Sequence, residues 1–252
     1  PSSTGSDRPV GGLILAALLL SGCVTAQVAV PPTQVADLER QLNGDERFLR
    51  VSMYQTPFFG DATRRLVSPV APELVRLLQS PDGKPISPGA AERVFAAGTP
   101  VRIRKVEFPS AWVMTERVLY TPRTLVWVYL DVTGTPKNAA PMVLVLRPGL
   151  KTQDEFLAEL ERHLTREDPT KRLEAFSDLV REAVKTKAVV LDMPSEALEM
   201  AWGFPDSKRI DLVDNQRKET WRWGDGARTA TVIDGKLAKF TGASGASSSS
   251  SP

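Results

Sequence analysis

The residue best suited to covalent chemistry is Cys23, the only cysteine of this 252-residue chain. Its thiolate is a nucleophile, and it follows Ser21 and Gly22, whose small side chains fit the pocket of a signal peptidase. The apolar run over residues 10–20 precedes them. That run is too short for a transmembrane helix, which needs about 20 apolar residues. The pattern predicts a signal peptide over residues 1–22, cut between Gly22 and Cys23.

The stretch Leu20-Ser21-Gly22-Cys23 resembles the lipobox of bacterial lipoproteins. That resemblance implies that Cys23 is lipidated, through diacylglyceryl and palmitate chains, and that residues 23–33 are a tether. Val24 stands where an Asp would favour retention, so the resemblance implies an outer-membrane address at the periplasmic face. The inner membrane and the cell surface remain open. The alternative is a buried apolar helix that happens to end in cysteine.

Composition restricts what the rest of the chain can do. Its 42% hydrophobic and 25% charged residues are ordinary for a globular protein, and a net charge of +2 does not indicate a nucleic-acid partner. A single histidine argues against His-based metal clusters and triads. Glu159 and Glu161 suit a solvated helix face. We therefore expect no enzyme, no cofactor and no metal, with a carboxylate-dependent hydrolase as the least favoured alternative.

Residues 34–96 are expected to form a helical lead-in that contains an aromatic loop. Short helices are predicted at residues 34–42, 72–78 and 88–97, and a strand at 50–54. Tyr54, Phe58 and Phe59 lie beside Pro57 and Gly60. These aromatic rings are a candidate contact surface if the loop is exposed, or a plug for the core if it is not.

Residues 97–150 alternate apolar and polar side chains, which favours strands. Strands are predicted at residues 99–106, 111–120, 124–132 and 142–146, forming a small antiparallel barrel. The opening over residues 97–103 resembles the first strand of bacterial SH3-like domains. Arg102 and Arg104, with Lys105 and Arg117, would form one basic face of that barrel. This face is either solvated or a surface for a cell-wall or peptide ligand.

Residues 151–187 are predicted to form a helix pair. Thr152 and Glu155 have the spacing of a capping box, and Asp168-Pro169 is a typical helix start. His163 is expected at the surface near the end of the first helix. The tail over residues 241–252 is rich in Gly, Ser and Ala, and predicts disorder.

Residues 188–240 are predicted to form a strand end, a short helix, a polar loop and a β-hairpin. Four short stretches stand in that order: Met193-Pro194-Ser195, Trp202-Gly203-Phe204-Pro205, Trp221-Arg222-Trp223 and Asp234-Gly235. The order resembles the BamE (SmpA/OmlA) family of outer-membrane lipoproteins, although Asp192 replaces the usual Gly and Trp223 the usual Tyr. Trp221 and Trp223 are therefore further candidates for a binding surface.

These observations together predict an α+β protein with an SH3-like barrel, a helix pair and a BamE-like module. The two resemblances imply a lipid-anchored, non-catalytic envelope component that binds another protein or has a structural role. Assembly of outer-membrane proteins is one process that the BamE-like module suggests. The alternative is an SH3-like lipoprotein that binds the cell wall or a peptide.

Overall fold

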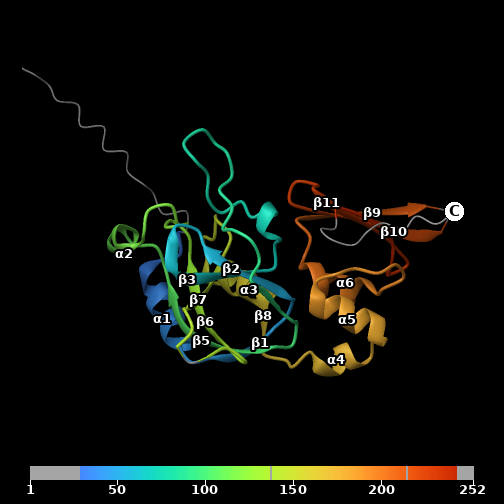
Figure 1. Cartoon of the computed structure of the whole chain (residues 1–252), viewed down its shortest axis with the longest axis horizontal. Coiled ribbons are helices and arrows are strands. Elements are labelled where there is room, and N and C mark those ends of the chain that lie inside the picture. Colours follow the sequence, from blue (N-terminus) through green and yellow to red (C-terminus); the bar gives the residue numbers. More distant parts are fainter. Residues whose placement is uncertain (1–28, 137, 214, 243–252) are drawn as a thin grey trace, which may run out of the picture.

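Two β-sheets and six α-helices form the described part of the chain, which a computed structural model gives for residues 29–136, 138–213 and 215–242. The protein is therefore of the α+β class. Predictions that fall on residues 1–28 and 243–252, including the signal peptide, Cys23 and nearly all of the tail, lie outside the described residues. Figure 1 shows the larger sheet with α1 and α2 at one end of the molecule, and the smaller sheet above α5 and α6 at the other.

The helices and strands have the following bounds. The helices are α1 (Pro32–Leu42), α2 (Ala111–Glu116), α3 (Gln153–His163), α4 (Thr170–Glu174), α5 (Asp178–Thr186) and α6 (Ser195–Trp202), with a 3₁₀ turn η1 (Pro72–Leu74). The larger sheet contains β1 (Glu46–Leu49), β2 (Met53–Phe58), β3 (Asp61–Ser68), β4 (Arg93–Phe95), β5 (Pro100–Glu107), β6 (Trp127–Val132), β7 (Met142–Val145) and β8 (Leu164–Thr165). The smaller sheet contains β9 (Ser207–Val213), β10 (Gln216–Trp223), β11 (Arg228–Ile233) and β12 (Lys236–Thr241).

The larger sheet has the order β4-β2-β3-β7-β6-β5-β1-β8. All of its neighbouring strands are antiparallel except β3 and β7, which pair in parallel at Arg65 with Met142 and at Leu66 with Val143. The expected barrel over residues 97–150 is therefore wrong. Its strands β5, β6 and β7 are three neighbours within an open sheet, because β7 pairs with β3 from the preceding segment and β5 pairs with β1.

Strand β6 is covered on both faces, as its nearly continuous apolar run predicts. Val126, Val128 and Leu130 belong to a core cluster that also contains buried side chains of α1 and α3. Leu125, Trp127 and Tyr129 belong to a second cluster on the other face, which is closed by Phe58 and by Val75. The alternation of side chains along a strand assigns successive residues to these two clusters.

The smaller sheet packs its apolar face against α5 and α6. Its core cluster contains Val180 and Val184 of α5, together with Trp202 of α6. The tight turn at Asp234-Gly235 is confirmed, since both residues have positive φ, as a type I′ turn requires. Residues 207–213 form strand β9 and residues 216–218 start β10, where the sequence predicts a polar loop.

Several predicted elements are wrong. Residues 111–120 form helix α2 and a loop instead of a strand, because the Ser110 hydroxyl accepts a hydrogen bond from Val113 N at 3.2 Å and caps a helix. Residues 88–97 contain strand β4, and residues 72–78 contain only η1. The second helix of the pair is divided into α4 and α5, since Ser177 caps a new helix. The helix over residues 34–42 and the Thr152 cap of α3 are confirmed.

Candidate functional site

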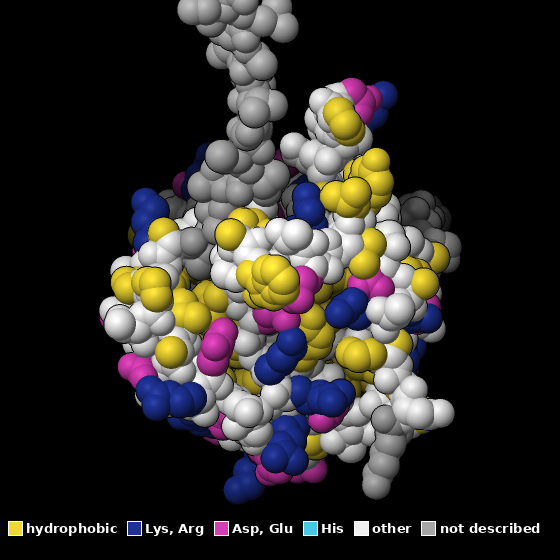
Figure 2. Space-filling model, turned by 90° about the vertical axis from the view of Figure 1, so that its left-hand side faces the viewer, with side chains coloured by type: hydrophobic (Ala, Val, Ile, Leu, Met, Phe, Trp, Pro, Cys, Tyr) yellow, Lys and Arg dark blue, Asp and Glu magenta, His cyan; other side chains and the backbone are white. Residues whose placement is uncertain are grey.

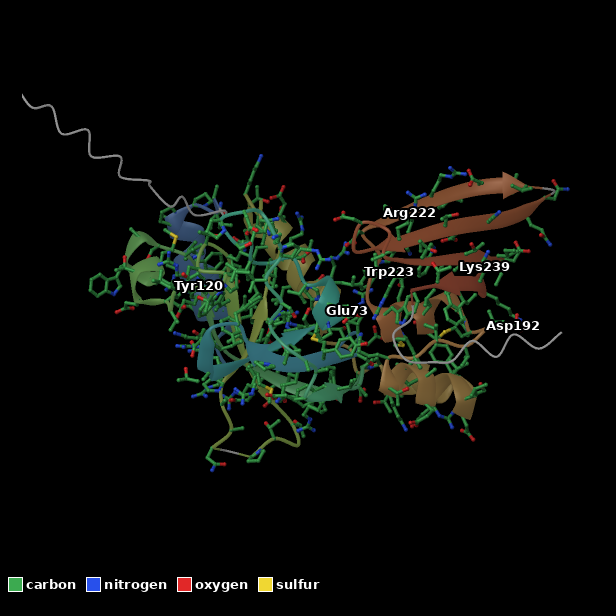
Figure 3. All side chains as sticks on the ribbon, turned by 45° about the horizontal axis from the view of Figure 1, so that its top comes forward. Glu73, Tyr120, Asp192, Arg222, Trp223 and Lys239 are labelled. Atoms are coloured by element: carbon green, nitrogen blue, oxygen red, sulfur yellow. The ribbon has the colours of Figure 1, made fainter. Side chains whose placement is uncertain are left out.

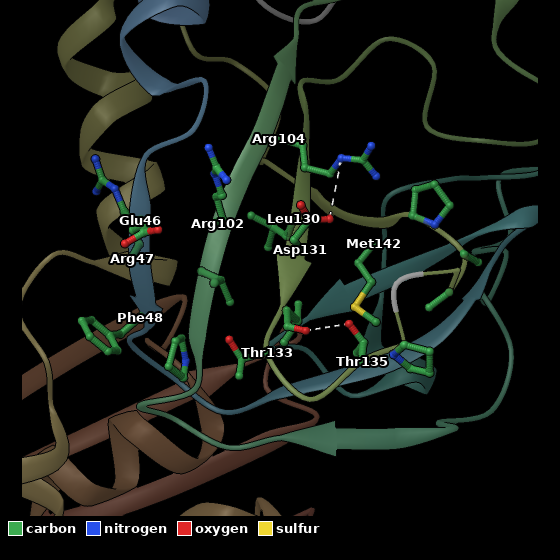
Figure 4. A pocket seen from close by; sticks show the side chains of 17 residues that line it. Glu46, Arg47, Phe48, Arg102, Arg104, Leu130, Asp131, Thr133, Thr135 and Met142 are labelled. Atoms are coloured by element: carbon green, nitrogen blue, oxygen red, sulfur yellow. Dashed lines mark hydrogen bonds and ion pairs between the residues drawn. The ribbon is translucent and has the colours of Figure 1, made fainter.

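An open groove of about 790 Å³ lies over β1, β5 and β6 (Figure 4). Arg102 and Arg104 of β5 line it, and both side chains are exposed. Across the groove, the segment between β6 and β7 contributes Thr133 and Thr135. The groove thus brings the two predicted arginines together with hydroxyl groups that can donate or accept hydrogen bonds.

A β-bulge shapes the cationic wall of this groove. The pairing of β5 with β6 shifts between Ile103 and Lys105, so that Arg104 is the extra residue of the ladder. A bulge redirects the side chain at the inserted position. Arg104 thereby approaches Asp131, with 3.6 Å between its Nε and the carboxylate Oδ1. The sequence pattern predicts that Arg102 and Arg104 share a face but gives no sign of the bulge.

Arg102 is the free cation of the groove. No ion pair or hydrogen bond joins its guanidinium to another side chain or carbonyl in the described ranges. Gly44 lies beside it, where an added Cβ would stand 3.3 Å from Arg102 Nη2. The guanidinium of an arginine matches carboxylate and phosphate groups in a bidentate geometry. Arg102 is therefore positioned to bind an anionic group that enters the groove.

Arg47 of β1 also lines the groove, and it is already paired. Arg47 is buried, and its Nε lies 2.9 Å from Asp45 Oδ2. The same carboxylate oxygen accepts a hydrogen bond from Arg166 Nη2 at 3.2 Å. Asp45 carries one negative charge against two arginines, Arg47 and Arg166, so this cluster keeps a net positive charge while Arg102 stays available.

The aromatic residues that the sequence proposes as a binding surface are mostly structural. Phe58 is fully buried and packs edge-on against Trp127, at 4.8 Å between ring centroids. Phe59 is half-buried beside it. Tyr54 is half-buried, and its ring lies 4.9 Å from Lys187 Nζ. The prediction that these rings fill the core is confirmed for Phe58, and the alternative that Phe58 belongs to an exposed contact surface is wrong.

Trp221 and Trp223 also lie inside the molecule, so the prediction that they belong to a binding surface is wrong. Both side chains face the helices that pack against the smaller sheet. Trp223 packs edge-on against Trp202, at 5.2 Å between ring centroids. Trp223 Nε1 donates to Gly203 O at 3.0 Å. Arg222, between them in β10, is exposed on the opposite face. Alternation along the strand explains this division.

Sequence reasoning missed an exposed apolar segment over residues 112–120. Trp112, Leu119 and Tyr120 are largely exposed, although the segment is predicted as a half-buried strand. Ser110 before α2 and Pro122 after the loop are the local signals of a helix and a turn that could have shown this.

Two neighbouring carboxylates, Glu196 and Glu199, are engaged by cations. Glu196 and Glu199 share a small cavity of about 190 Å³. Arg172 Nη1 lies 3.6 Å from Glu196, and Lys208 Nζ lies 2.5 Å from Glu199. Within the described ranges, no group of three or more His, Cys, Asp or Glu side chains could hold a metal ion.

His163 is another correction, because it is largely buried rather than at the surface. Its Nε2 lies 3.2 Å from Glu159 Oε1, and Arg147 Nε lies 3.1 Å from Glu159 Oε2. Burial alone would raise the pKa of Glu159. The hydrogen bond from His163 and the nearby arginine charges outweigh burial and lower that pKa.

Comparisons with known proteins identify no relative of this chain. Among the described residues, none of the helices combines the length and apolar character needed to cross a membrane. No protein-family model, curated protein or solved structure matches the chain.

Proposed function

We propose that this chain is a lipid-anchored, non-catalytic binding protein of the bacterial cell envelope, tethered through Cys23 at the periplasmic face of the outer membrane. The support for the anchor is the sequence Leu20-Ser21-Gly22-Cys23 after an apolar run. Support for a binding role comes from the groove over β5 and β6, whose arginines can hold a ligand. The order of α6 and strands β9–β12 supports a BamE-like module and, with it, a role in outer-membrane assembly.

The ligand of the groove is an acidic segment of a partner protein. Arg102 carries this proposal, since its guanidinium is exposed and has no partner among the described residues. Arg104 and the buried Arg47 add positive charge on either side. An arginine wall favours carboxylate side chains and accelerates association with acidic partners.

Photo-crosslinking in cells tests this function. A photoreactive amino acid at Thr133, on the wall opposite β5, should form an adduct with an envelope protein. Arg102→Glu should reduce that adduct at least fivefold, since it places a like charge against the acidic segment. Arg222→Glu is the matched control, because Arg222 is also an exposed arginine but lies on the smaller sheet. An adduct that survives Arg102→Glu would contradict the proposal.

The same free arginine favours a second candidate, a cell-wall ligand with carboxylate groups. Sedimentation with purified peptidoglycan separates the two candidates. Binding to peptidoglycan that is lost in Arg102→Glu with Arg104→Glu, without a protein adduct, would identify the cell wall as the ligand. Intact mass and membrane fractionation of Cys23→Ala test the anchor separately, because that variant should lack the lipid mass.

A further inference from the structure

Four large apolar side chains are exposed within nine residues of one another. Trp112 is 71% exposed, Val118 43%, Leu119 60% and Tyr120 68%. Exposed apolar residues on soluble proteins are normally scattered singly, and a contiguous patch marks an interaction surface. We call these four residues the apolar tip.

The apolar tip is held rigidly by a buried arginine. The Arg117 guanidinium donates hydrogen bonds to Arg123 O at 2.7 Å and to Leu125 O at 2.8 Å. It also forms an ion pair with Glu107 at 2.9 Å and lies 3.8 Å from the centroid of the Trp127 ring. The loop after α2, which carries Val118, Leu119 and Tyr120, is thus fixed to β5 and β6, and the exposure of these three side chains is a property of the fold.

Tyr120 adopts a backbone conformation that projects it outward. Its φ is +61°, in the left-handed region that side chains larger than Gly, Asn or Asp rarely adopt. Gly60 supports this conformation from below, where its N–H donates to Tyr120 O at 3.4 Å. A Cβ at Gly60 would lie 3.3 Å from Leu119 O, so the two segments approach closely. The backbone of Tyr120 is therefore held in a strained conformation, with its side chain exposed.

The apolar tip lies at the end of the molecule from which the chain leads back to the proposed anchor. Helices α1 and α2 are at this end in Figure 1, opposite the smaller sheet. Figure 3 places Tyr120 far from Arg222 and Lys239 of that sheet. Helix α1 begins at Pro32, nine residues after Cys23. Nine extended residues span at most about 30 Å, so lipidation at Cys23 would hold this end close to the bilayer.

The chemistry around the tip matches a lipid surface. Trp and Tyr are the residues that favour the membrane–water interface, because each has an apolar ring and a polar group. A cavity of about 540 Å³ beside Tyr120 is lined by Arg76 and Arg123, which can attract headgroup phosphates. Figure 2, which views this end, shows apolar side chains gathered in its upper half and Lys and Arg predominating below.

We infer that the apolar tip docks into the interface of the bilayer that holds the lipid anchor, with Arg76 and Arg123 on the headgroup phosphates. The inference rests on the proposed anchor at Cys23. Docking by a second surface would fix the orientation of the body, because a single tether leaves it free to rotate. The groove beside β5 would then have a constant direction relative to the membrane.

Tryptophan fluorescence of the full lipidated chain tests the inference. Trp112 is exposed, whereas the other four tryptophans are buried: Trp127, Trp202, Trp221 and Trp223. The protein is bound to vesicles of phosphatidylethanolamine and phosphatidylglycerol with brominated acyl chains, which quench tryptophans that enter the bilayer. The fluorescence intensity should fall by roughly one fifth, the contribution of one tryptophan in five. Trp112→Phe should abolish that quenching while the protein still floats with the vesicles.

A matched pair of variants separates docking from general surface apolarity. Leu119→Ser should lower the quenching of Trp112 at least threefold. Leu212→Ser should leave it unchanged, since Leu212 is 76% exposed on strand β9 of the other sheet. Protein that floats without Trp112 quenching would overturn the docking and leave the anchor intact. Protein that does not float with the vesicles would overturn both the docking and the anchor. Crosslinking of residue 112 to an envelope protein in place of lipid would overturn the docking alone.

Discussion

Lys187 Nζ donates a hydrogen bond to the backbone carbonyl oxygen of Ser52 at 2.7 Å, and this bond joins the end of α5 to the link between β1 and β2. The same ammonium group donates to Ala201 O at 2.6 Å, at the end of α6. Ser52 N in turn donates to Met200 O at 2.7 Å. The link between β1 and β2 is thus fixed to the last turn of α6, whose carbonyl groups have no partner within the helix.

Lys187→Met should destabilise the protein by about 1–3 kcal/mol at neutral pH, because it leaves two buried carbonyl groups without a donor. Lys187 is almost completely buried. Chemical denaturation measures the free energy of unfolding. The exposed Lys185→Met is the control, and it should change stability by less than about 0.5 kcal/mol. Equal stabilities of the two variants would show that the hydrogen bonds of Lys187 contribute nothing.

The same variant predicts a pH dependence. Burial, reinforced by the charge of Arg228, holds the pKa of Lys187 well below its usual value. The unfolded chain therefore binds more protons at this side chain, between the folded pKa and the unfolded value of about 10.4. The unfolding free energy of the parent protein should rise with pH across that window relative to Lys187→Met. A constant difference would contradict the lowered pKa.

Ser52→Ala should cost about 2 kcal/mol of stability. The buried Ser52 hydroxyl donates to Val184 O at 2.6 Å and accepts from Ala97 N at 2.9 Å. Removal of this oxygen leaves both backbone groups unsatisfied in the interior. Thermal unfolding measures the loss, with the exposed Ser207→Ala as a control that stays within about 0.5 kcal/mol. Similar melting temperatures would argue against a bridging role for Ser52.

Tyr120→Asn should raise the unfolding free energy by up to about 1 kcal/mol, because Asn tolerates the left-handed conformation better than Tyr. Little packing is lost, since most of the Tyr120 side chain is exposed. Leu119→Asn, at a position outside the left-handed region, should not stabilise. Urea denaturation compares the two. A destabilised Tyr120→Asn would mean that the ring packs more tightly than its exposure indicates.

Glu159→Gln should reduce the loss of stability in acid. The pKa of Glu159 is lowered in the folded protein, so its carboxylate stabilises the fold above about pH 4.3 and this contribution disappears as the pH falls through the folded pKa. Gln does not titrate and removes that part of the acid transition. Unfolding measured from pH 6 to pH 2 shows the effect. Glu161→Gln, at an exposed position, should retain the parent profile.

The sequence predicts the elements that are stabilised by neighbouring residues in the chain. Thr152 caps α3, the Asp234-Gly235 turn forms, and the alternating residues of β5 form a strand. The apolar residues after Ser110 favour a strand by propensity, but the hydroxyl cap gives a helix instead. Strand propensity and a helix cap differ by only about 1 kcal/mol in free energy, and the sequence of a short segment does not reveal which of them prevails.

The candidate site is only partly visible in the sequence. The spacing of Arg102 and Arg104 predicts that they share a face, and both line the groove. The expectation that Arg117 joins this face is wrong, because Arg117 is buried. The sequence does not reveal the β-bulge at Arg104 or the free state of Arg102, because both depend on pairing with β6 and on the position of Gly44. The burial of Trp221 likewise depends on its distant contacts with α6.

The parallel pairing of β3 with β7 determines the order in which this sheet can assemble. Arg65 pairs with Met142, so β3 has no partner on that side until β7 has been synthesised. Contacts this far apart in sequence slow folding and leave strand edges open to aggregation. Chains that end before residue 142 should therefore bind chaperones and resist refolding, whereas longer chains should fold cooperatively.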